Sequence, residues 1–154
     1  MKSRKSRVLL LENSLKSRVL VLDGAMGTAI QDKNLKAKDF GGEDLEGCNE
    51  VLVLSRPDLI QGIHESYLRA GADIIETNTF GGTPIVLAEY GLQDKTYDIN
   101  LAAARIARDA CEKFSTRQQP RFVAGSIGPT TKAISVTGGI TFEELIENFY
   151  HQAK

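Results

Sequence analysis

The sequence has little that would indicate a charged macromolecular partner or a membrane. Its 154 residues include 19 basic and 20 acidic side chains, and only 6% are aromatic. A nucleic-acid groove and a surface for an acidic partner both need more charge of one sign, so a small molecule is the default partner. No apolar run approaches the length of a membrane span. With 42% hydrophobic and 25% charged residues, the chain fits one globular core of moderate size.

Cysteine is also scarce. Cys48 and Cys111 are far apart and form no Cys-x-x-Cys spacing, so nothing indicates a disulfide framework or a local zinc ribbon. We therefore expect a reducing compartment, the cytoplasm. Cys111 falls on the apolar side of a predicted helix and is expected in the core, whereas Cys48 stands in a polar loop without a partner ligand. His64, in mid-helix, is expected to pack or to lie on the surface rather than act as a base.

Residues 1–16 are basic and contain one short apolar run at 8–11. This run is too short for the core of a signal peptide, and no small-residue cleavage site follows it. We predict an amphipathic helix that packs on the domain with Val8, Leu9 and Leu15 inward. The Arg and Ser content leaves a transit peptide as the weaker alternative. Residues 17–154 are then a single domain.

The rest of the chain alternates between strand and helix patterns. In chain order, the predicted elements are a strand at 18–22, a long polar loop at 31–49, a helix at 57–70, a strand at 73–79, helices at 83–91 and 96–114, a strand at 121–129 and a helix from 141. Such alternation is typical of a parallel α/β sheet. Rossmann-type and barrel folds both fit it, but Gly24-Ala-Met-Gly27 is not the dinucleotide-binding fingerprint, which disfavours a Rossmann domain.

Two of these helices have clear boundary signals. Ser55 and Pro57 precede the helix at 57–70 and Gly71 follows it, while Thr141 and Glu144 form a capping box before the last helix. The face of the last helix that we expect to point inward consists of Phe142, Leu145, Ile146 and Phe149.

The predicted strands end in small, polar, glycine-rich stretches, "DGAMGT" at 23–28, "ETNTFGG" at 76–82 and "GSIGPT" at 125–130. Ligands of parallel α/β folds bind beyond the carboxyl ends of the strands, so the three stretches predict one shared pocket. Carboxylates there pair with a substrate ammonium, and hydroxyl or amide groups orient a substrate carboxylate. The alternative for each is a structural acceptor or loop brace. The candidate substrate-binding residues are Asp23, Gly24, Glu76, Asn78, Thr79 and Ser126.

The same stretches carry a family resemblance. "VLDGAMGT", "GADIIETNTFGG" and "VAGSIGPT", in this order and spacing, resemble the start of the homocysteine S-methyltransferase family. The loop "DFGGEDLEGCNEVLVLSRPDLI" is most similar to the cobalamin-dependent methionine synthase branch. The resemblance runs from about residue 17 to the last residue.

This resemblance implies a (β/α)8 TIM barrel that binds homocysteine, holds its thiolate on zinc and presents it to a methyl donor, methylcobalamin recharged by 5-methyltetrahydrofolate. A full barrel takes about 250 residues, so we expect only the first three βα units here. The family's zinc ligands are late cysteines ending in a Cys-Cys pair, which this sequence lacks. We therefore expect neither a catalytic nor a metal-binding residue, no ligand for cobalamin, and an amino-terminal fragment that is inactive alone.

Two alternatives remain open. The methyl donor could be betaine or S-methylmethionine, or the chain could be a non-catalytic partial barrel that binds an amino acid or a partner chain. In each case three parallel strands leave two open edges, so we also expect an isolated chain that is marginally folded and prone to associate.

Overall fold

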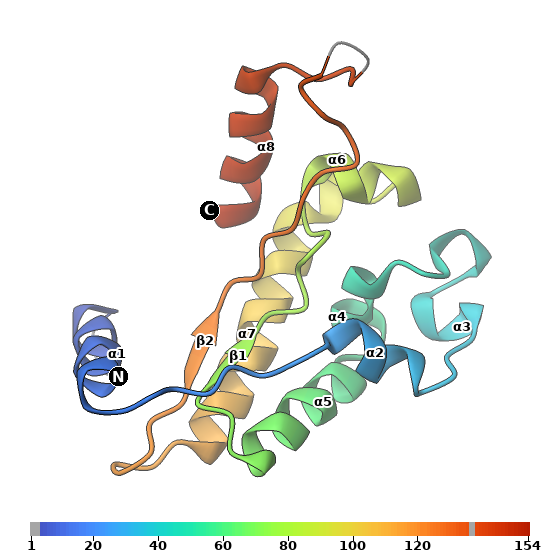
Figure 1. Cartoon of the computed structure of the whole chain (residues 1–154). Coiled ribbons are helices and arrows are strands. Elements are labelled where there is room, and N and C mark those ends of the chain that lie inside the picture. The colour runs from blue at the N-terminus through green and yellow to red at the C-terminus, as the bar shows by residue number, and fades with distance from the viewer. Residues whose placement is uncertain (1–3, 136–137) are drawn as a thin grey trace.

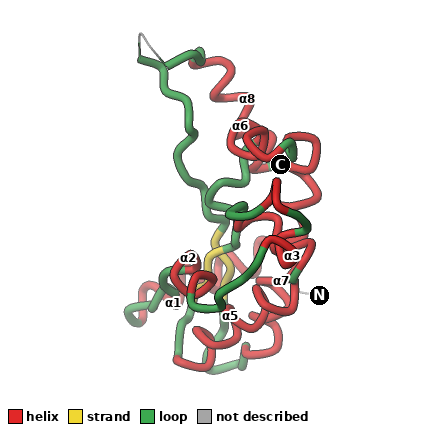
Figure 2. Tube along the Cα trace, turned by 90° about the vertical axis from the view of Figure 1, so that its right-hand side faces the viewer, coloured by secondary structure: helices red, strands yellow, loops and turns green. Residues whose placement is uncertain are grey.

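A short parallel sheet lies at the centre of the computed structural model, which describes residues 4–135 and 138–154 (Figures 1 and 2). Strand β1 (Ile74–Glu76) pairs in parallel with β2 (Phe122–Ala124), and Ile74 lies opposite Phe122. The predicted strands at 73–79 and 121–129 are therefore present but much shorter. The α/β class and the parallel direction are confirmed. No helix in the described ranges is long and apolar enough to cross a membrane.

The predicted strand at 18–22 is reduced to one parallel bridge between Leu22 and Ile74. Backbone bonds still join this segment to β1, since the carbonyl oxygen of Val21 accepts from the Asp73 and Ile74 N–H groups and Asp23 N–H donates to Ile74. The spatial order is thus segment 18–22, β1, β2, as expected for consecutive βα units. The strand does not extend further because the Val21 N–H is bound by a side chain instead of a neighbouring backbone.

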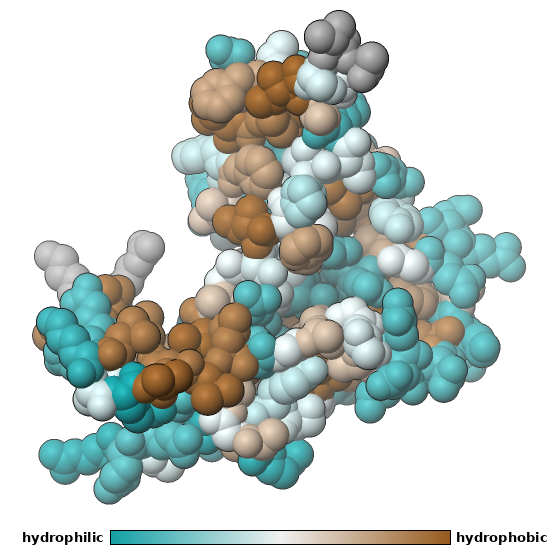
Figure 3. All heavy atoms as spheres, in the orientation of Figure 1, coloured by the Kyte–Doolittle hydropathy of each residue, from teal (hydrophilic) through white to brown (hydrophobic). Residues whose placement is uncertain are grey.

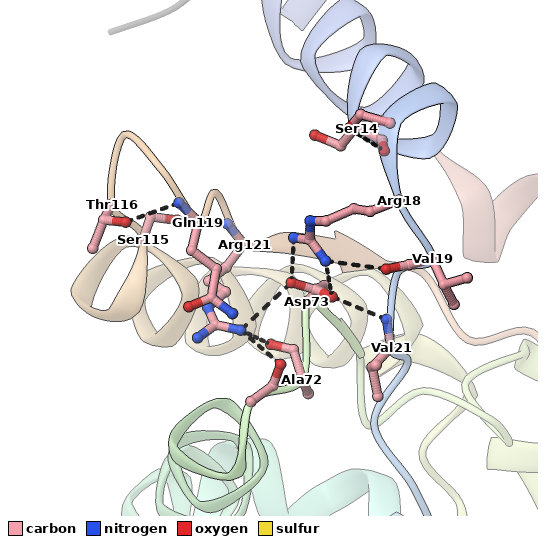
Figure 4. Close-up of polar contacts among 12 residues, drawn as sticks. Ser14, Arg18, Val19, Val21, Ala72, Asp73, Ser115, Thr116, Gln119 and Arg121 are labelled. Atoms are coloured by element: carbon pink, nitrogen blue, oxygen red, sulfur yellow. Dashed lines mark hydrogen bonds and ion pairs between the residues drawn. The ribbon is translucent and has the colours of Figure 1, made fainter.

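That side chain is the buried carboxylate of Asp73 (Figure 4). Its two oxygens accept hydrogen bonds from the Arg18 guanidinium, each at 2.7 Å, and Oδ2 also accepts from the Val21 N–H at 3.0 Å. Arg121 lies 3.7 Å from Oδ1 and donates to the carbonyl oxygen of Ala72. The Arg18 hydrogen bond is the main reason that the pKa of Asp73 falls to about 2. Asp73 therefore fixes segment 18–22 to β1 at its amino-terminal end.

Helices α5 (Pro57–Ala70) and α7 (Thr96–Phe114) pack on each other and on the strands, and both match the predicted ranges. Helix α5 starts with Pro57 in its first turn and ends at Gly71, whose φ of 114° is left-handed, so both signals act as predicted. Ser55 bonds back to Val51 instead of capping α5. The buried face of α7 includes Ile99 and Cys111, which confirms Cys111 as a core residue.

The prediction of an unstructured loop at 31–49 is wrong, because short helical turns fill the region between segment 18–22 and α5. They bury Phe40, Cys48 and Leu52 in the main core, and this burial stabilises turns too short to form alone. In chain order they are α2 (Met26–Gln31), α3 (Ala37–Phe40), η1 (Glu43–Leu45), η2 (Asn49–Val51) and α4 (Leu52–Ser55).

Between β1 and α7 the predicted helix at 83–91 appears as α6 (Pro84–Leu87) and a 3-10 turn, η3 (Ala88–Tyr90), that ends at Gly91. Thr83 caps α6 by accepting the Val86 N–H. A further turn, η4 (Gln93–Lys95), leads into α7.

The first helix, α1 (Arg4–Ser17), forms as predicted but does not turn the predicted residues inward. Val8, Leu9 and Leu15 are 50%, 56% and 57% exposed. Val8 and Leu15 are seven residues apart and lie on one side of the helix, and Leu9 lies about 100° around the axis from Val8, yet both sides are exposed. Figure 1 shows α1 standing apart from α5 and α7, beside β2.

The last helix, α8 (Phe142–Ala153), starts with the predicted capping box of Thr141 and Glu144 but is rotated relative to our expectation. It buries Asn148 and Gln152, while Phe142 and Ile146 are exposed. Asn148 and Gln152 find backbone partners on the inner side, and the predicted inward residues Leu145 and Phe149 are half-buried.

His64 of α5 is fully buried in the core, which confirms that it packs. Neither ring nitrogen has a hydrogen-bond partner among the described residues. Burial without a partner disfavours the charged imidazolium and lowers the pKa of His64 to about 4.

Replacing Asp73 by Asn should lower the free energy of unfolding by about 2 kcal/mol, because the Arg18 guanidinium loses its bidentate partner. The figure is below that of a fully buried ion pair since the Arg18 side chain is 39% exposed. Urea denaturation at pH 7 measures the change. Glu112→Gln, which removes the exposed group 3.9 Å from Arg108, is the matched control and should have no measurable effect. Equal effects of the two substitutions would contradict the role of Asp73.

His64 should make the protein less stable in acid. The unfolded chain protonates its histidine near pH 6.5 but the folded chain only near pH 4, so stability is lost as the pH falls through this window, on the order of 3 kcal/mol. His64→Leu should remove this loss, measured as the difference from wild type in urea midpoints between pH 4 and 7. His151→Gln, at the other and exposed histidine, is the control. Parallel pH profiles for His64→Leu and wild type would rule out the assignment.

Candidate functional site

A pocket of about 430 Å³ opens at the carboxyl ends of segment 18–22, β1 and β2, where the sequence predicts it. Five of the six candidate residues line it, and Thr79 does not. Three stretches far apart in the sequence meet there, as parallel βα units require. The lining residues are Asp23, Gly24, Ala25, Met26, Gly27, Asn49, Glu50, Glu76, Thr77, Asn78, Phe80 and Ser126.

Asp23 ends segment 18–22 and reaches across to β1. Its Oδ1 and Oδ2 atoms accept the Glu76 N–H at 3.1 and 3.2 Å. Partial burial is the largest influence on its carboxyl group and, with repulsion from the Glu76 carboxylate, outweighs this hydrogen bond, so the pKa of Asp23 rises to about 6. Asp23 is therefore a structural acceptor and at the same time a carboxylate whose ionisation is unfavourable in the folded chain.

Glu76 places a second carboxylate in the same pocket. Its side chain is exposed, and its Oε2 atom lies 3.5 Å from the Ser126 hydroxyl, which donates to it. Asp23, Glu76 and Ser126 thus come from three different segments and face one space. The described part of the pocket lining contains three carboxylates, those of Asp23, Glu50 and Glu76, and no Lys or Arg, so its field favours a cationic group.

The polar run after β1 is largely bonded to its neighbours. The Thr77 hydroxyl accepts the Ser126 N–H at 3.0 Å and lies 2.6 Å from the Thr79 hydroxyl, which donates to the Ser126 carbonyl oxygen at 2.8 Å. Asn78 donates from Nδ2 to the carbonyl oxygen of Asn49 at 2.8 Å. Thr79 is therefore a buried brace behind the pocket wall, while Asn78 lines the pocket and ties it to the preceding loop.

Sequence reasoning missed the contribution of Asn49 and Glu50. Glu50 accepts the Gly81 N–H at 2.7 Å through Oε1, which fixes the glycine turn after β1. Gly82 has no room for a side chain, because a Cβ atom there would lie 2.8 Å from Oδ1 of Asn100 and 3.0 Å from the Thr79 carbonyl oxygen. The available signal is the run of polar residues around Cys48, a pattern that by itself predicts only a loop.

Helix α8 holds the two pocket loops together from behind. The Gln152 Nε2 atom donates to the Thr79 carbonyl oxygen at 2.7 Å and lies 3.4 Å from that of Ser126. Asn148, one turn earlier, accepts the Ile85 N–H at 3.0 Å. These contacts explain why α8 buries amides instead of apolar side chains.

The cysteines do not form a metal site. Cys48 and Cys111 are both buried, and burial is the largest influence that raises their thiol pKa values, to about 11 and about 12. A metal-bound thiolate needs the opposite shift. No group of three potential metal ligands occurs within residues 4–135 and 138–154. The residues present therefore do not fit a zinc ion.

Comparison with known proteins agrees with this arrangement. Residues 20–154 match the family model described as homocysteine S-methyltransferase. The chain belongs to the homocysteine S-methyltransferase family. The match covers the three strand-end stretches that line the pocket, and it confirms the family resemblance.

Two solved structures of the homocysteine methyltransferase MmuM from Escherichia coli are similar to the chain. The oxidized form is 28% identical with a TM-score of 0.62, over 75% of this chain and 39% of MmuM. The metallated form is 27% identical with a TM-score of 0.64, over 77% of this chain and 41% of MmuM. The chain thus spans about two fifths of the length of these relatives.

Asp23→Asn should stabilise the protein at pH 8 but not at pH 4. Folding raises the pKa of Asp23 from 3.8 to about 6, so ionising this carboxyl group costs more free energy in the folded chain than in the unfolded chain. The folded state therefore loses stability as the pH rises from 3.8 through about 6, and it keeps that stability at lower pH. The Asn side chain is neutral throughout and keeps an oxygen that can accept the Glu76 N–H. Thermal unfolding at the two pH values measures the effect. If the Asp23→Asn substitution does not raise the unfolding midpoint at pH 8, ionised Asp23 does not destabilise the folded chain.

Proposed function

We propose that this chain forms the amino-terminal part of a homocysteine-binding (β/α)8 barrel and that its pocket holds the amino-acid end of homocysteine. The observation that carries this proposal is the pair of carboxylates, Asp23 and Glu76, at one pocket mouth. Its support is the family match and the spatial order of segment 18–22, β1 and β2, which is that of three consecutive barrel strands.

The ammonium group of the substrate is assigned to Asp23 and Glu76. Both carboxylates line the pocket, and Asp23 is partly buried, which strengthens its attraction for a cation. An ammonium group between them offsets the burial and the repulsion from Glu76 that raise the pKa of Asp23. Binding should therefore ionise Asp23 and release its proton when the pH is near or below 6.

The carboxylate end of homocysteine is assigned to the side of the pocket formed by Gly24, Asn78 and Ser126. Ser126 has a rotatable hydroxyl at the lining. The Nδ2 atom of Asn78 is engaged by Asn49, so Asn78 acts by holding this wall in place. Thr79, a buried brace, supports the same wall without contacting the ligand.

The reaction we propose for the whole enzyme is methyl transfer to the homocysteine sulfur. Zinc, which the family resemblance implies for the thiolate, does not fit Cys48 or Cys111, so we assign no step of the transfer to this chain. Alone, it should bind homocysteine without turning it over.

Two observations bear on the methyl donor and favour different branches. The loop at 39–60 most resembles the methionine synthase branch, whose donor is methylcobalamin recharged by 5-methyltetrahydrofolate. The two MmuM structures described above favour the donors of the other branch, S-methylmethionine or betaine. We propose the methylcobalamin branch, because the loop carries Asn49 and Glu50 to the pocket.

The test is a titration of the 154-residue chain with homocysteine, followed by NMR of the side-chain carboxyls. Millimolar homocysteine should lower the pKa of Asp23, and 4-mercaptobutyrate, which lacks the ammonium group, should not. Asp23→Asn and Glu76→Gln should each weaken binding about 10-fold or more, as expected for a charge-assisted hydrogen bond.

Glu46→Gln, an exposed carboxylate outside the pocket, is the matched control and should bind like wild type. Unchanged binding by both pocket variants, or equal binding of 4-mercaptobutyrate, would overturn the proposal.

A further inference from the structure

Two apolar areas of the surface, one over α8 and one beside β2, are brown in Figure 3. The remaining strands and helices of the proposed barrel would cover both areas, so neither indicates a partner. Contacts buried inside the described chain do not depend on the rest of the barrel. One group of them lies where β1 and β2 lead into the pocket and involves Thr77, Thr79 and Ser126.

Beyond the two strands, the parallel ladder continues through a side chain. The Thr77 N–H donates to the Ala124 carbonyl oxygen at 2.9 Å, as a regular ladder requires. The next bond would join the Ser126 N–H to the Thr77 carbonyl oxygen, but this oxygen accepts the Thr79 N–H at 2.9 Å instead. The Thr77 hydroxyl replaces it and accepts the Ser126 N–H at 3.0 Å. The chain can therefore leave the strand at Thr77 without losing the bond to the neighbouring segment.

The Thr79 hydroxyl closes this contact into a ring. Its Oγ1 atom donates to the Ser126 carbonyl oxygen at 2.8 Å and lies 2.6 Å from Oγ1 of Thr77. A threonine hydroxyl has one proton, and that of Thr79 is used, so Thr77 is the donor in the 2.6 Å bond. The ring thus runs in one direction, from the Ser126 N–H through Thr77 and Thr79 to the Ser126 carbonyl oxygen. Both threonines are buried, where each bond of such a ring strengthens the next.

The ring holds the backbone of Ser126 at both of its polar groups, the N–H and the carbonyl oxygen. Ser126 lies between Gly125 and Gly128 in a glycine-rich loop, which by itself permits many backbone conformations. With both groups bound, the direction in which the Ser126 side chain leaves the backbone is fixed. The ring therefore sets the place from which the Ser126 hydroxyl reaches the pocket.

The ring also determines which hydroxyl of the pocket can donate to a ligand. Thr77 and Ser126 are the two hydroxyl-bearing residues of the described lining. The Thr77 proton is bound to Thr79, whereas the Ser126 hydroxyl donates to Oε2 of Glu76 across 3.5 Å, which is longer than an ordinary O–H···O bond. A substrate carboxylate can displace this long contact, so Ser126 is the hydroxyl donor that the pocket offers.

We propose that Thr77 and Thr79 are positioning residues for homocysteine binding, because they hold Ser126 so that its hydroxyl donates to the substrate carboxylate. This inference rests on the proposed function, which makes homocysteine the ligand of the pocket. Neither threonine needs to donate to the ligand. Their contribution to the affinity passes through Ser126.

Substitutions at Thr79 test this role in titrations of the 154-residue chain with homocysteine, followed by NMR. Thr79→Val keeps the size of the side chain but removes the hydroxyl. It should weaken binding about 10-fold, as should Ser126→Ala, because each deprives the charged carboxylate of an aligned donor. Thr79→Ser keeps the hydroxyl and should bind like wild type. 3-Aminopropane-1-thiol, which lacks the carboxylate of homocysteine, should bind equally to wild type and to all three variants.

A double-mutant cycle separates positioning from a general loss of structure. In a chain that carries Ser126→Ala, Thr79→Val should cause no further loss of affinity, because it acts only through the Ser126 hydroxyl. Thr96→Val is the matched control, since Thr96 is also buried and its hydroxyl donates to the Gln93 carbonyl oxygen at 2.7 Å, outside the pocket. It should bind homocysteine like wild type. Additive losses in the cycle, a Thr79→Ser variant as weak as Thr79→Val, or unchanged binding by Thr79→Val would each overturn the positioning role.

Hydrogen exchange at the Ser126 amide tests the ring without a ligand. Thr77→Val removes the acceptor of this N–H, so its exchange should become about 10-fold faster or more, while Thr77→Ser should preserve its protection. Equal exchange in wild type and Thr77→Val would show that the ring does not hold Ser126. If the exchange data agree but the wild-type chain binds no homocysteine, the proposed function is wrong, and the ligand role of Ser126 is wrong with it.

Discussion

The architecture depends on how segment 18–23 is held against β1, and two aspartates do this reciprocally. Asp73 of the β1 side accepts the Val21 N–H at the amino-terminal end, and Asp23 of the segment accepts the Glu76 N–H at the carboxyl end. Segment 18–23 and β1 are therefore joined by aspartate carboxylates at both ends and by backbone hydrogen bonds in between. The free energy needed to ionise the two carboxyl groups differs. Asp73 has Arg18 as a counter-charge and a pKa of about 2, whereas Asp23 has none in the described structure and a pKa of about 6. The carboxylate that is unfavourable to ionise therefore lies on the pocket side, where a cationic ligand can offset the cost.

The sequence predicted best the elements whose signals are local. Helix α5 matches its predicted range because Pro57 and Gly71 determine its ends through backbone geometry alone. The capping box at Thr141 was found for the same reason. The strands were overestimated because a β-pattern shows which residues can pair but not whether a neighbouring backbone is present. Val21 illustrates this, since its N–H is bound by Asp73.

The candidate pocket was predictable in position and only partly in detail. Strand ends meet in any parallel α/β fold, so the prediction brought Asp23, Glu76 and Ser126 together correctly. It could not distinguish Thr79 from Ser126, because whether a hydroxyl faces the ligand or the loop depends on the path of the backbone. The inward face of α8 was predicted only in part, since Leu145 and Phe149 are half-buried but Phe142 and Ile146 are exposed, because hydrophobic periodicity assumes an apolar partner. Here the inner side of α8 meets backbone carbonyls and N–H groups, which amides satisfy and apolar side chains cannot.

Gln152 gives this rotation of α8 a further consequence. Its amide spans the carbonyl oxygens of Thr79 and Ser126, which belong to the two loops that form the pocket wall, while Phe142 and Ile146 of the same helix are exposed. A contact that shifts α8 therefore shifts the spacing of those loops. Gln152 is thus the point at which the position of α8 and the spacing of the two pocket loops depend on each other.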